Sequence, residues 1–355
     1  MNTTKYCIIP IFIPHFGCSH QCVFCNQRKI TGQETPVTAE QVSEIIEESL
    51  VKITGRRQVE LAFYGGSFTA LSLDCQYELL QPAYQALQRN LIHSIRISTR
   101  PDCINPVIVK NLAMLGVRTV ELGVQSMDDA VLAGANRGHT AKDVSNATSL
   151  IKNAGLACGV QLMPGLPGEN WSSLICTVTK IIGLRPDFAR VYPTLVIAGT
   201  PLANLYYDNR YKPLTIPEAV AKSAYIKLTF EQQGIKVIRT GLQATAELSK
   251  AHVVLAGPYH PAFGELVDSF LFFLMAAHCI EILSYSACEG EMTIHHHPKD
   301  SSKLRGVSGE NIRRLKKTYK LSSIILKPDH HTLGELVIDF HGLSISINKN
   351  MLNYI

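Results

Sequence analysis

Strand-like and helix-like segments alternate six times along the first two-thirds of this chain of 355 residues. The expected strands are short, continuously apolar runs, over residues 6–13, 58–64, 94–98, 118–124, 158–163 and 188–192. Helical patterns lie between them, over residues 38–52, 77–91, 107–115, 141–154 and 171–182. Apolar strands separated by helices are typical of a parallel sheet with helices outside. Six such units predict an α/β fold, a partial (βα)6 TIM-type barrel, and are too few for a closed eightfold barrel.

The alternation loosens beyond about residue 195. We expect residues 1–240 to form the barrel domain and residues 241–355 to form a small α+β extension. Within the extension, the apolar run over 270–283 contains His, Cys and Glu and is too short to cross a bilayer. It therefore predicts a buried core helix and no membrane association.

The composition is that of a globular protein, with 46% hydrophobic and 18% charged residues. The formal net charge of +5 permits an anionic partner without requiring one. Ten cysteines without a secretory signal predict a reducing compartment, and hence a cytoplasmic location.

Three cysteines follow the first expected strand in a C-x3-C-x2-C spacing: Cys18, Cys22 and Cys25. Three thiolates on one short loop can hold three irons of a [4Fe–4S] cube and leave the fourth iron without a protein ligand. An open metal position is where a substrate or cofactor binds. The aromatic Phe24 sharpens the spacing to C-x3-C-x-aromatic-C. The alternative is a structural zinc site with His15 or His20 as fourth ligand, although zinc ribbons usually carry a second C-x2-C pair.

Polar and glycine-rich motifs follow the other strands, at the edge where parallel α/β sheets bind ligands. Paired glycines let a ligand approach the backbone, arginine can clamp a carboxylate, and glutamine can bond hydroxyls. Ordinary turns and a salt bridge at the rim are the alternatives. With Phe24 from the cysteine loop, the candidate binding residues are Gly65, Gly66, Ser67, Phe68, Arg100, Gln125, Pro164 and Gly165.

Several motifs in order carry a resemblance to a known family. They span residues 63–69, 98–102, 121–126, 162–168 and 190–200. With the cysteines, they resemble the radical S-adenosylmethionine (SAM) superfamily, and within it the Elongator catalytic subunit family. Two departures stand out: eukaryotic and archaeal members have a longer gap between the first two cysteines, and too few residues remain here for their acetyltransferase domain. The chain is therefore most similar to a short bacterial type.

The resemblance implies an enzyme that binds a [4Fe–4S] cluster and SAM. A flavodoxin or ferredoxin would supply one electron, and reductive cleavage of SAM would give a 5′-deoxyadenosyl radical for hydrogen abstraction. Gly65 and Gly66 would hold the SAM amine, with Ser67 where a glutamate often stands. Arg100 and Gln125 would contact the SAM carboxylate and ribose. The Pro164–Gly165 turn would face adenine.

Three substrate hypotheses stay open. The family favours RNA modification, with tRNA as the partner, and a helix over 310–319 adds a basic face of Arg313, Lys316, Lys317 and Lys320. A solvated helix face is the plainer explanation of those charges. The second hypothesis is a small molecule of the tetrapyrrole type, because coproporphyrinogen-oxidising relatives share two of the motifs. The third is a non-catalytic iron–sulfur scaffold.

Overall fold

The computed structural model describes residues 5–13, 21–26, 37–55, 57–243, 245, 248, 250, 252–283 and 290–352. The chain divides into two compact units. The first comprises residues 1–214 and 243–258, and the second comprises residues 215–242 and 259–355. The boundary expected at residue 240 stays a prediction, because packing alone does not define an independent domain.

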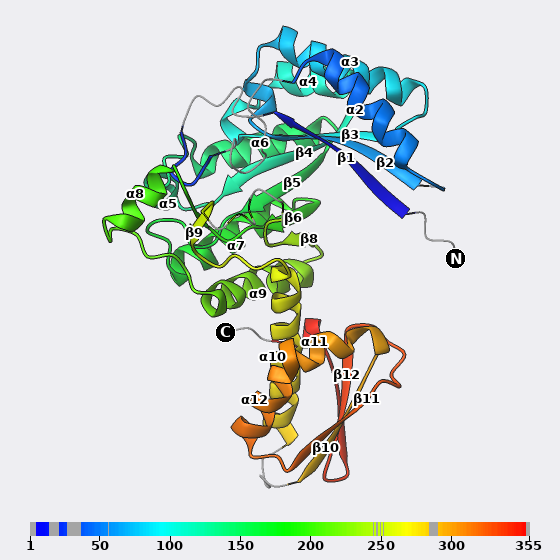
Figure 1. Cartoon of the computed structure of the whole chain (residues 1–355), viewed down its shortest axis with the longest axis vertical. Helices are drawn as coiled ribbons and strands as arrows, with labels where there is room; N and C mark the ends of the chain where they lie inside the picture. Colours follow the sequence, from blue (N-terminus) through cyan, green and yellow to red (C-terminus); the bar gives the residue numbers. More distant parts are fainter. Residues whose placement is uncertain are drawn as a thin grey trace. The chain divides into compact units, whose positions relative to one another are not determined.

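Parallel strands form the frame of the first unit (Figure 1). Six of them are hydrogen-bonded in sequence order, each parallel to the next: β1 (Lys5–Ile13), β2 (Arg57–Gly65), β3 (Ser94–Thr99), β4 (Val117–Gln125), β5 (Ala157–Leu162) and β6 (Phe188–Val191). The partial α/β barrel predicted from the alternating pattern is thus confirmed. Two short antiparallel strands, β7 (Val196–Ile197) and β9 (Val254–Ala256), complete this unit.

Helices follow the strands of the first unit. They are α2 (Ala39–Lys52), α3 (Leu73–Gln88), α4 (Pro106–Met114), α5 (Asp129–Gly134), α6 (Ala141–Asn153), α7 (Trp171–Leu184) and α8 (Pro201–Tyr207). Polar caps set where they begin: Thr38 and Thr140 form capping boxes, and Ser72 accepts from the backbone N–H of Cys75. Because Ser72 caps α3, this helix starts four residues before the predicted position.

The parallel arrangement decides where a ligand can bind. Along the middle of the strands, side chains such as Leu61, Phe63 and Ile97 are fully buried in the core. Since the strands run in one direction, their carboxyl ends, including Gly65, Thr99 and Gln125, lie at one edge of the sheet. The loops at that edge carry the candidate site.

The second unit combines helices with a small mixed sheet. Its helices are α9 (Ile216–Gln232), α10 (Phe263–Leu283), α11 (Ser301–Arg305) and α12 (Glu310–Tyr319). Its strands are β8 (Lys236–Thr240), β10 (Glu291–His296), β11 (Ser323–Lys327), β12 (Glu335–Phe340) and β13 (Leu343–Asn348), the last four in the sheet order β11-β10-β12-β13. In the described part of the chain, α10 alone has the length and apolarity to cross a membrane. One such helix is weak evidence for a span, and 56% of its apolar window is buried inside the protein, as in a core helix.

Candidate functional site

The cysteine segment is held against the carboxyl edge of the sheet. Cys22 is buried and Cys25 is partly exposed, whereas Cys18 lies outside the described residues. The backbone N–H of Val23 donates to the carbonyl of Ala135 over 3.1 Å, and the N–H of Cys25 donates to the carbonyl of Cys22 over 3.1 Å. Two of the three predicted ligands are therefore fixed in place by the backbone.

Phe24 anchors this segment by packing. Together with Val23 it contacts two groups of buried side chains: Val131, Ala135, Met163 and Leu166, and Val196, Leu202, Ala203 and Tyr211. The carbonyl of Val23 also accepts from the N–H of Leu202 over 2.8 Å. An aromatic side chain between the second and third cysteines thus orients the loop, and the cofactor contact expected of Phe24 stays a prediction.

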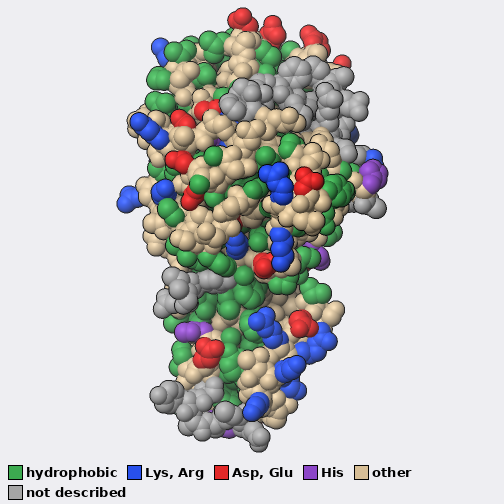
Figure 2. Space-filling model, turned by 90° about the vertical axis from the view of Figure 1, so that its left-hand side faces the viewer, with side chains coloured by type: hydrophobic (Ala, Val, Ile, Leu, Met, Phe, Trp, Pro, Cys, Tyr) green, Lys and Arg blue, Asp and Glu red, His purple; other side chains and the backbone are tan. Residues whose placement is uncertain are grey.

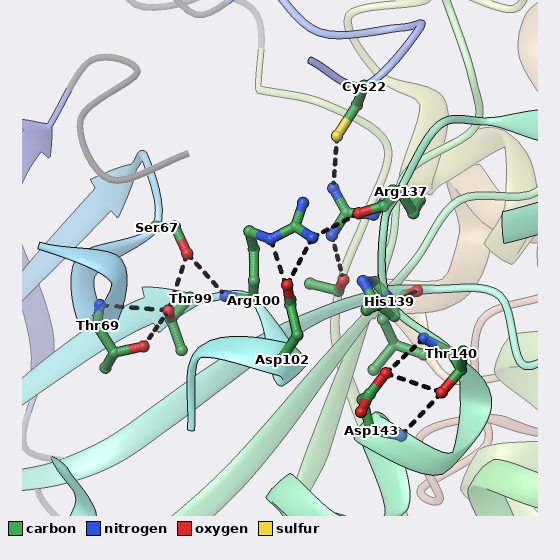
Figure 3. Close-up of polar contacts among 12 residues, drawn as sticks. Cys22, Ser67, Thr69, Thr99, Arg100, Asp102, Arg137, His139, Thr140 and Asp143 are labelled. Carbon is green, nitrogen blue, oxygen red and sulfur yellow. Dashed lines mark hydrogen bonds and ion pairs between the residues drawn. The ribbon is translucent and has the colours of Figure 1, made fainter. Parts of the chain in front are cut away.

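A buried arginine points at the second cysteine (Figure 3). Arg137, only 6% exposed, donates from Nη1 to Sγ of Cys22 over 3.0 Å and from Nη2 to the carbonyl of Gly123 over 2.6 Å. Its guanidinium also lies 5.9 Å from the centroid of the Phe24 ring. A cation in this position stabilises negative charge on the sulfur.

Arg100 lies beside Arg137. Its Nε and Nη2 bind the carboxylate of Asp102 over 3.0 and 2.9 Å, and Nη2 also donates to the carbonyl of Arg137 over 2.5 Å (Figure 3). Nη1 of Arg100 and Nε of Arg137 are buried and have no hydrogen-bond partner among the described residues. A buried donor without a partner costs about 1–3 kcal/mol. Two such donors near one cysteine indicate that an anionic group belongs there.

The glycine pair ends β2 in a conformation that suits close approach. Gly65 has a φ of +100°, which a residue with a Cβ rarely adopts. Both Gly65 and Gly66 are partly exposed, whereas Ser67 behind them is buried. Backbone groups rather than side chains therefore face the rim at this position.

Ser67 and Phe68 have structural partners. The Ser67 hydroxyl lies 3.1 Å from the Thr99 hydroxyl and accepts from the N–H of Arg100 over 3.2 Å, which joins the loops after β2 and β3 (Figure 3). The Phe68 ring is 1% exposed and packs 5.1 Å from the Phe63 ring, centroid to centroid. The binding roles expected of these two side chains stay predictions.

Gln125 has a strained backbone. Its φ is +68° at the end of β4, next to a register shift between β4 and β5. Such strain in a residue other than glycine costs roughly 1–3 kcal/mol and is concentrated at functional sites. The side-chain carbonyl accepts from Nε2 of Gln161 over 3.1 Å. The amide N–H groups of Gln125 are left to donate elsewhere.

The turn after β5 is fixed from several sides. The N–H of Gly165 donates to Glu169 over 2.8 Å, its carbonyl accepts from the hydroxyl of Tyr211 over 2.6 Å, and the carbonyl of Pro164 accepts from the N–H of Thr194 over 2.9 Å. Gly165 has a φ of +91°. These polar groups are satisfied internally and both Pro164 and Gly165 are buried, so the turn is rigid, and the contact with adenine expected of it stays a prediction.

Ionised side chains are paired on one face of the sheet. Glu121 binds Nη1 of Arg96 and lies 3.0 Å from Nη2 of Arg190, while Glu60 lies 2.7 Å from Nη2 of Arg96. All four side chains are at most 13% exposed. Burial alone would lower the pKa of Arg96, but the carboxylates of Glu121 and Glu60 raise it. Glu121 is thus a buried carboxylate with a structural role.

Two residues near the cysteines, Arg137 and His139, were not predicted from the sequence. His139 is 4% exposed, and its Nε2 lies 3.2 Å from the carbonyl of Val124. Burial, followed by the charge of Arg137, lowers the pKa of His139 to about 4. The ring is therefore neutral at pH 7. The contact of Arg137 with Cys22 joins residues 115 positions apart, and no local pattern in the sequence predicts it.

Comparison with known proteins identifies the family. Residues 12–180 match the model of the radical SAM superfamily, and residues 186–271 match the model of the Radical_SAM C-terminal domain. The chain belongs to the radical SAM superfamily. Radical SAM proteins bind a [4Fe–4S] cluster and SAM.

Two curated relatives show which radical SAM proteins this chain is similar to. The chain is 30% identical over 234 residues to a protein named tRNA uridine(34) acetyltransferase from Methanocaldococcus jannaschii, which covers 60% of this chain and 42% of the relative. It is 31% identical over 188 residues to human Elongator complex protein 3, covering 46% of this chain and 34% of the relative. The chain thus spans about two-fifths or less of the length of these curated relatives.

A solved structure shares the fold. The archaeal Methanocaldococcus infernus Elp3 with an N-terminal deletion superposes with a TM-score of 0.59 over 95% of this chain and 74% of that chain, at 21% identity. At this identity the comparison supports the fold alone.

The residues at the rim fit the two groups that radical SAM proteins bind. Cys22 and Cys25 supply thiolates, and Arg137 supplies positive charge to a sulfur ligand. The open donors on Arg100 and Arg137 suit a carboxylate, and Gly65 and Gly66 allow close approach of an amine. No set of three His, Cys, Asp or Glu side chains that could hold a metal occurs within the described ranges, which exclude Cys18.

Proposed function

We propose that this chain is a radical SAM enzyme acting on RNA, with tRNA as its substrate. Cys18, Cys22 and Cys25 hold a [4Fe–4S] cluster, and SAM binds beside it at the carboxyl edge of the sheet. The observation that carries this proposal is the pair of buried, unpartnered arginine donors beside Cys22. When bound, the cluster and SAM supply one-electron cleavage of SAM to a 5′-deoxyadenosyl radical that abstracts hydrogen.

The carboxylate of SAM is assigned to the two arginines. Asp102 fixes the plane of the Arg100 guanidinium and leaves Nη1 to donate. Nε of Arg137 is the second donor. Since both groups are already oriented by neighbouring residues, little side-chain entropy is lost when a carboxylate binds.

The other ends of SAM are assigned to the neighbouring loops. Carbonyls of Gly65 and Gly66 accept from the amine, and the buried Ser67 holds this loop in place through its bonds to Thr99 and Arg100. The amide of Gln125 donates to a ribose hydroxyl, and Pro164 and Gly165 give adenine an apolar wall that limits access of water. Electrons come from a flavodoxin or ferredoxin in the cytoplasm.

The tRNA assignment is supported by the relatives. One relative is named tRNA uridine(34) acetyltransferase and another is named Elongator complex protein 3. The proposal concerns radical chemistry on RNA and does not extend to acetyl transfer.

The test is cleavage of SAM by anaerobically reconstituted protein. Wild type with a chemical reductant should form 5′-deoxyadenosine, and Cys22→Ala and Cys25→Ala should not. Cys176→Ala is the matched control, because Cys176 is an exposed cysteine outside the motif. If Cys22→Ala keeps the cleavage rate of the control, the assignment of the cluster ligands is wrong.

The substrate is tested in the same reaction. Total tRNA should increase the formation of 5′-deoxyadenosine, and a modified nucleoside should be found after digestion. If coproporphyrinogen stimulates cleavage and tRNA does not, the enzyme acts on a small molecule instead. An intact cluster without any cleavage would indicate a non-catalytic scaffold.

A further inference from the structure

The positive charge of the chain is concentrated in one segment of the second unit. Residues 301–327 contain eight Lys or Arg residues and one acidic residue, Glu310, which gives a net charge of +7. The whole chain carries +5, so the other residues together carry −2. Both family matches end at or before residue 271, so this segment lies outside them. Figure 2 shows Lys and Arg side chains gathered on the lower part of the molecule, which belongs to the second unit.

Three of these cations line a hollow between α12 and β11. The hollow has a volume of about 350 Å³, and its lining includes Arg305, Arg313 and Lys316 over an apolar floor of Ile312, Ile324 and Leu326. Leu315, on the inner face of α12, is completely buried and fixes the helix against its unit. The basic side chains are thus presented by a packed helix.

Most of this charge is not neutralised within the protein. Glu310 pairs with Arg313 over 2.8 Å, but both side chains are about two-thirds exposed, and an exposed pair contributes little. Lys316, Lys317 and Lys320 have no carboxylate partner in the described part of the chain. A row of unpaired cations repels itself, and an external polyanion removes that cost.

We infer that the α12–β11 face, defined by Arg305, Arg313, Lys316, Lys317 and Lys320, binds the phosphate backbone of a folded RNA. This inference rests on the proposed function for the choice of RNA as the polyanion. Regular spacing of cations along one helix face suits consecutive phosphates.

The residues that line the hollow also indicate which part of the RNA they contact. Single-stranded RNA is usually held by stacking of its bases on aromatic rings. The described residues that line the hollow are aliphatic, basic or small, and Tyr319 at the end of α12 is engaged by Glu281 over 2.7 Å. We therefore expect contacts to phosphates with little dependence on base sequence.

The experiment measures binding of this chain, without its cluster, to total tRNA between 50 and 200 mM salt. Three phosphate contacts correspond to a slope of log K on log salt of about −2.7, or about 40-fold weaker binding over that range. The triple variant Arg305→Gln, Arg313→Gln, Lys316→Gln should lose about this part of the salt dependence and bind more weakly at 50 mM salt. Circular dichroism should show that it is folded.

The matched control removes the same charge from the first unit. Lys110, Arg118 and Lys142 are exposed there, and their triple replacement by Gln should leave tRNA affinity within about twofold of wild type. Equal losses in both triple variants would show a general charge effect and overturn the inference.

Other outcomes also decide the matter. Unchanged tRNA binding by the α12 variant would refute the surface. Binding to phosphatidylserine-containing vesicles but not to tRNA would reassign it to a membrane, against the inference. The binding experiment does not need the cluster, so the two proposals can fail separately. If the chain binds tRNA but does not cleave SAM, only the proposed function is contradicted. If the chain cleaves SAM but the α12 triple variant binds tRNA as well as wild type does, only this inference is contradicted.

Discussion

The hydrogen bond from Arg137 to Cys22 predicts how the reduction potential of the cluster changes when Arg137 is replaced. Reduction adds one negative charge to the cluster and its sulfur ligands, so a cation bonded to a ligand sulfur stabilises the reduced state more than the oxidised state. Replacing Arg137 with Met removes the charge and the 3.0 Å bond but retains an apolar side chain in the buried space. The midpoint potential should therefore fall.

The size of the change follows from the kind of bond that is lost. A hydrogen bond to a charged group contributes about 1.5–3 kcal/mol. If the reduced state gains about 1.5 kcal/mol more than the oxidised state, the potential of a one-electron couple falls by about 65 mV, since about 59 mV corresponds to a tenfold change in the equilibrium constant. Arg137→Lys retains the charge, so the potential of this variant should fall by less.

The assay is an anaerobic redox titration of the reconstituted protein without SAM, followed by the absorbance of the cluster. Arg89→Met is the control, because Arg89 is exposed at the end of α3. Iron content and circular dichroism of each variant establish that the cluster and fold are intact. A potential for Arg137→Met equal to or above that of wild type would refute the reasoning.

Three further predictions concern stability. Glu121→Gln should lower the free energy of unfolding by about 3–5 kcal/mol because it leaves buried arginines undercompensated, and adding Arg190→Gln should recover part of this loss in urea titrations. The lowered pKa of His139 means that the unfolded chain binds the proton more readily, so stability should be constant above about pH 6.5 and fall by up to about 3 kcal/mol towards pH 4. His139→Asn should lack that part of the pH dependence; an unchanged profile would contradict the burial argument. Gly165→Ala should lower the melting temperature because of its φ of +91° and a leucine side chain 2.8 Å from the added Cβ, whereas Gly183→Ala, with open space in α7, should not.

The arrangement of strands could be predicted because each is a short apolar run. The six runs correspond to β1–β6 within two residues at either end. Helix starts were harder to predict, since they depend on caps: Ser72 begins α3 early, and this helix continues through Pro82. The core helix α10 begins at Phe263 rather than residue 270, because the polar residues Glu265 and Asp268 in its first turns mask the apolar pattern.

The candidate site was predictable only where spacing is local. Cysteines three or four residues apart and a glycine pair after a strand are visible in one stretch of sequence. The contact of Arg137 with Cys22 depends on the fold, because the sheet brings together loops 115 residues apart. Likewise, no pattern in the sequence predicts that the Ser67 hydroxyl joins the loops after β2 and β3.

The central claim is that a cluster held by three cysteines keeps one iron open for SAM. The most direct measurement is electron paramagnetic resonance of the reduced, reconstituted protein before and after addition of SAM, with iron and sulfide determined on the same sample. The account predicts four iron and four sulfide per chain and a spectrum that changes when SAM is added. Zinc in place of iron, or a [4Fe–4S] spectrum that SAM leaves unchanged, would contradict it.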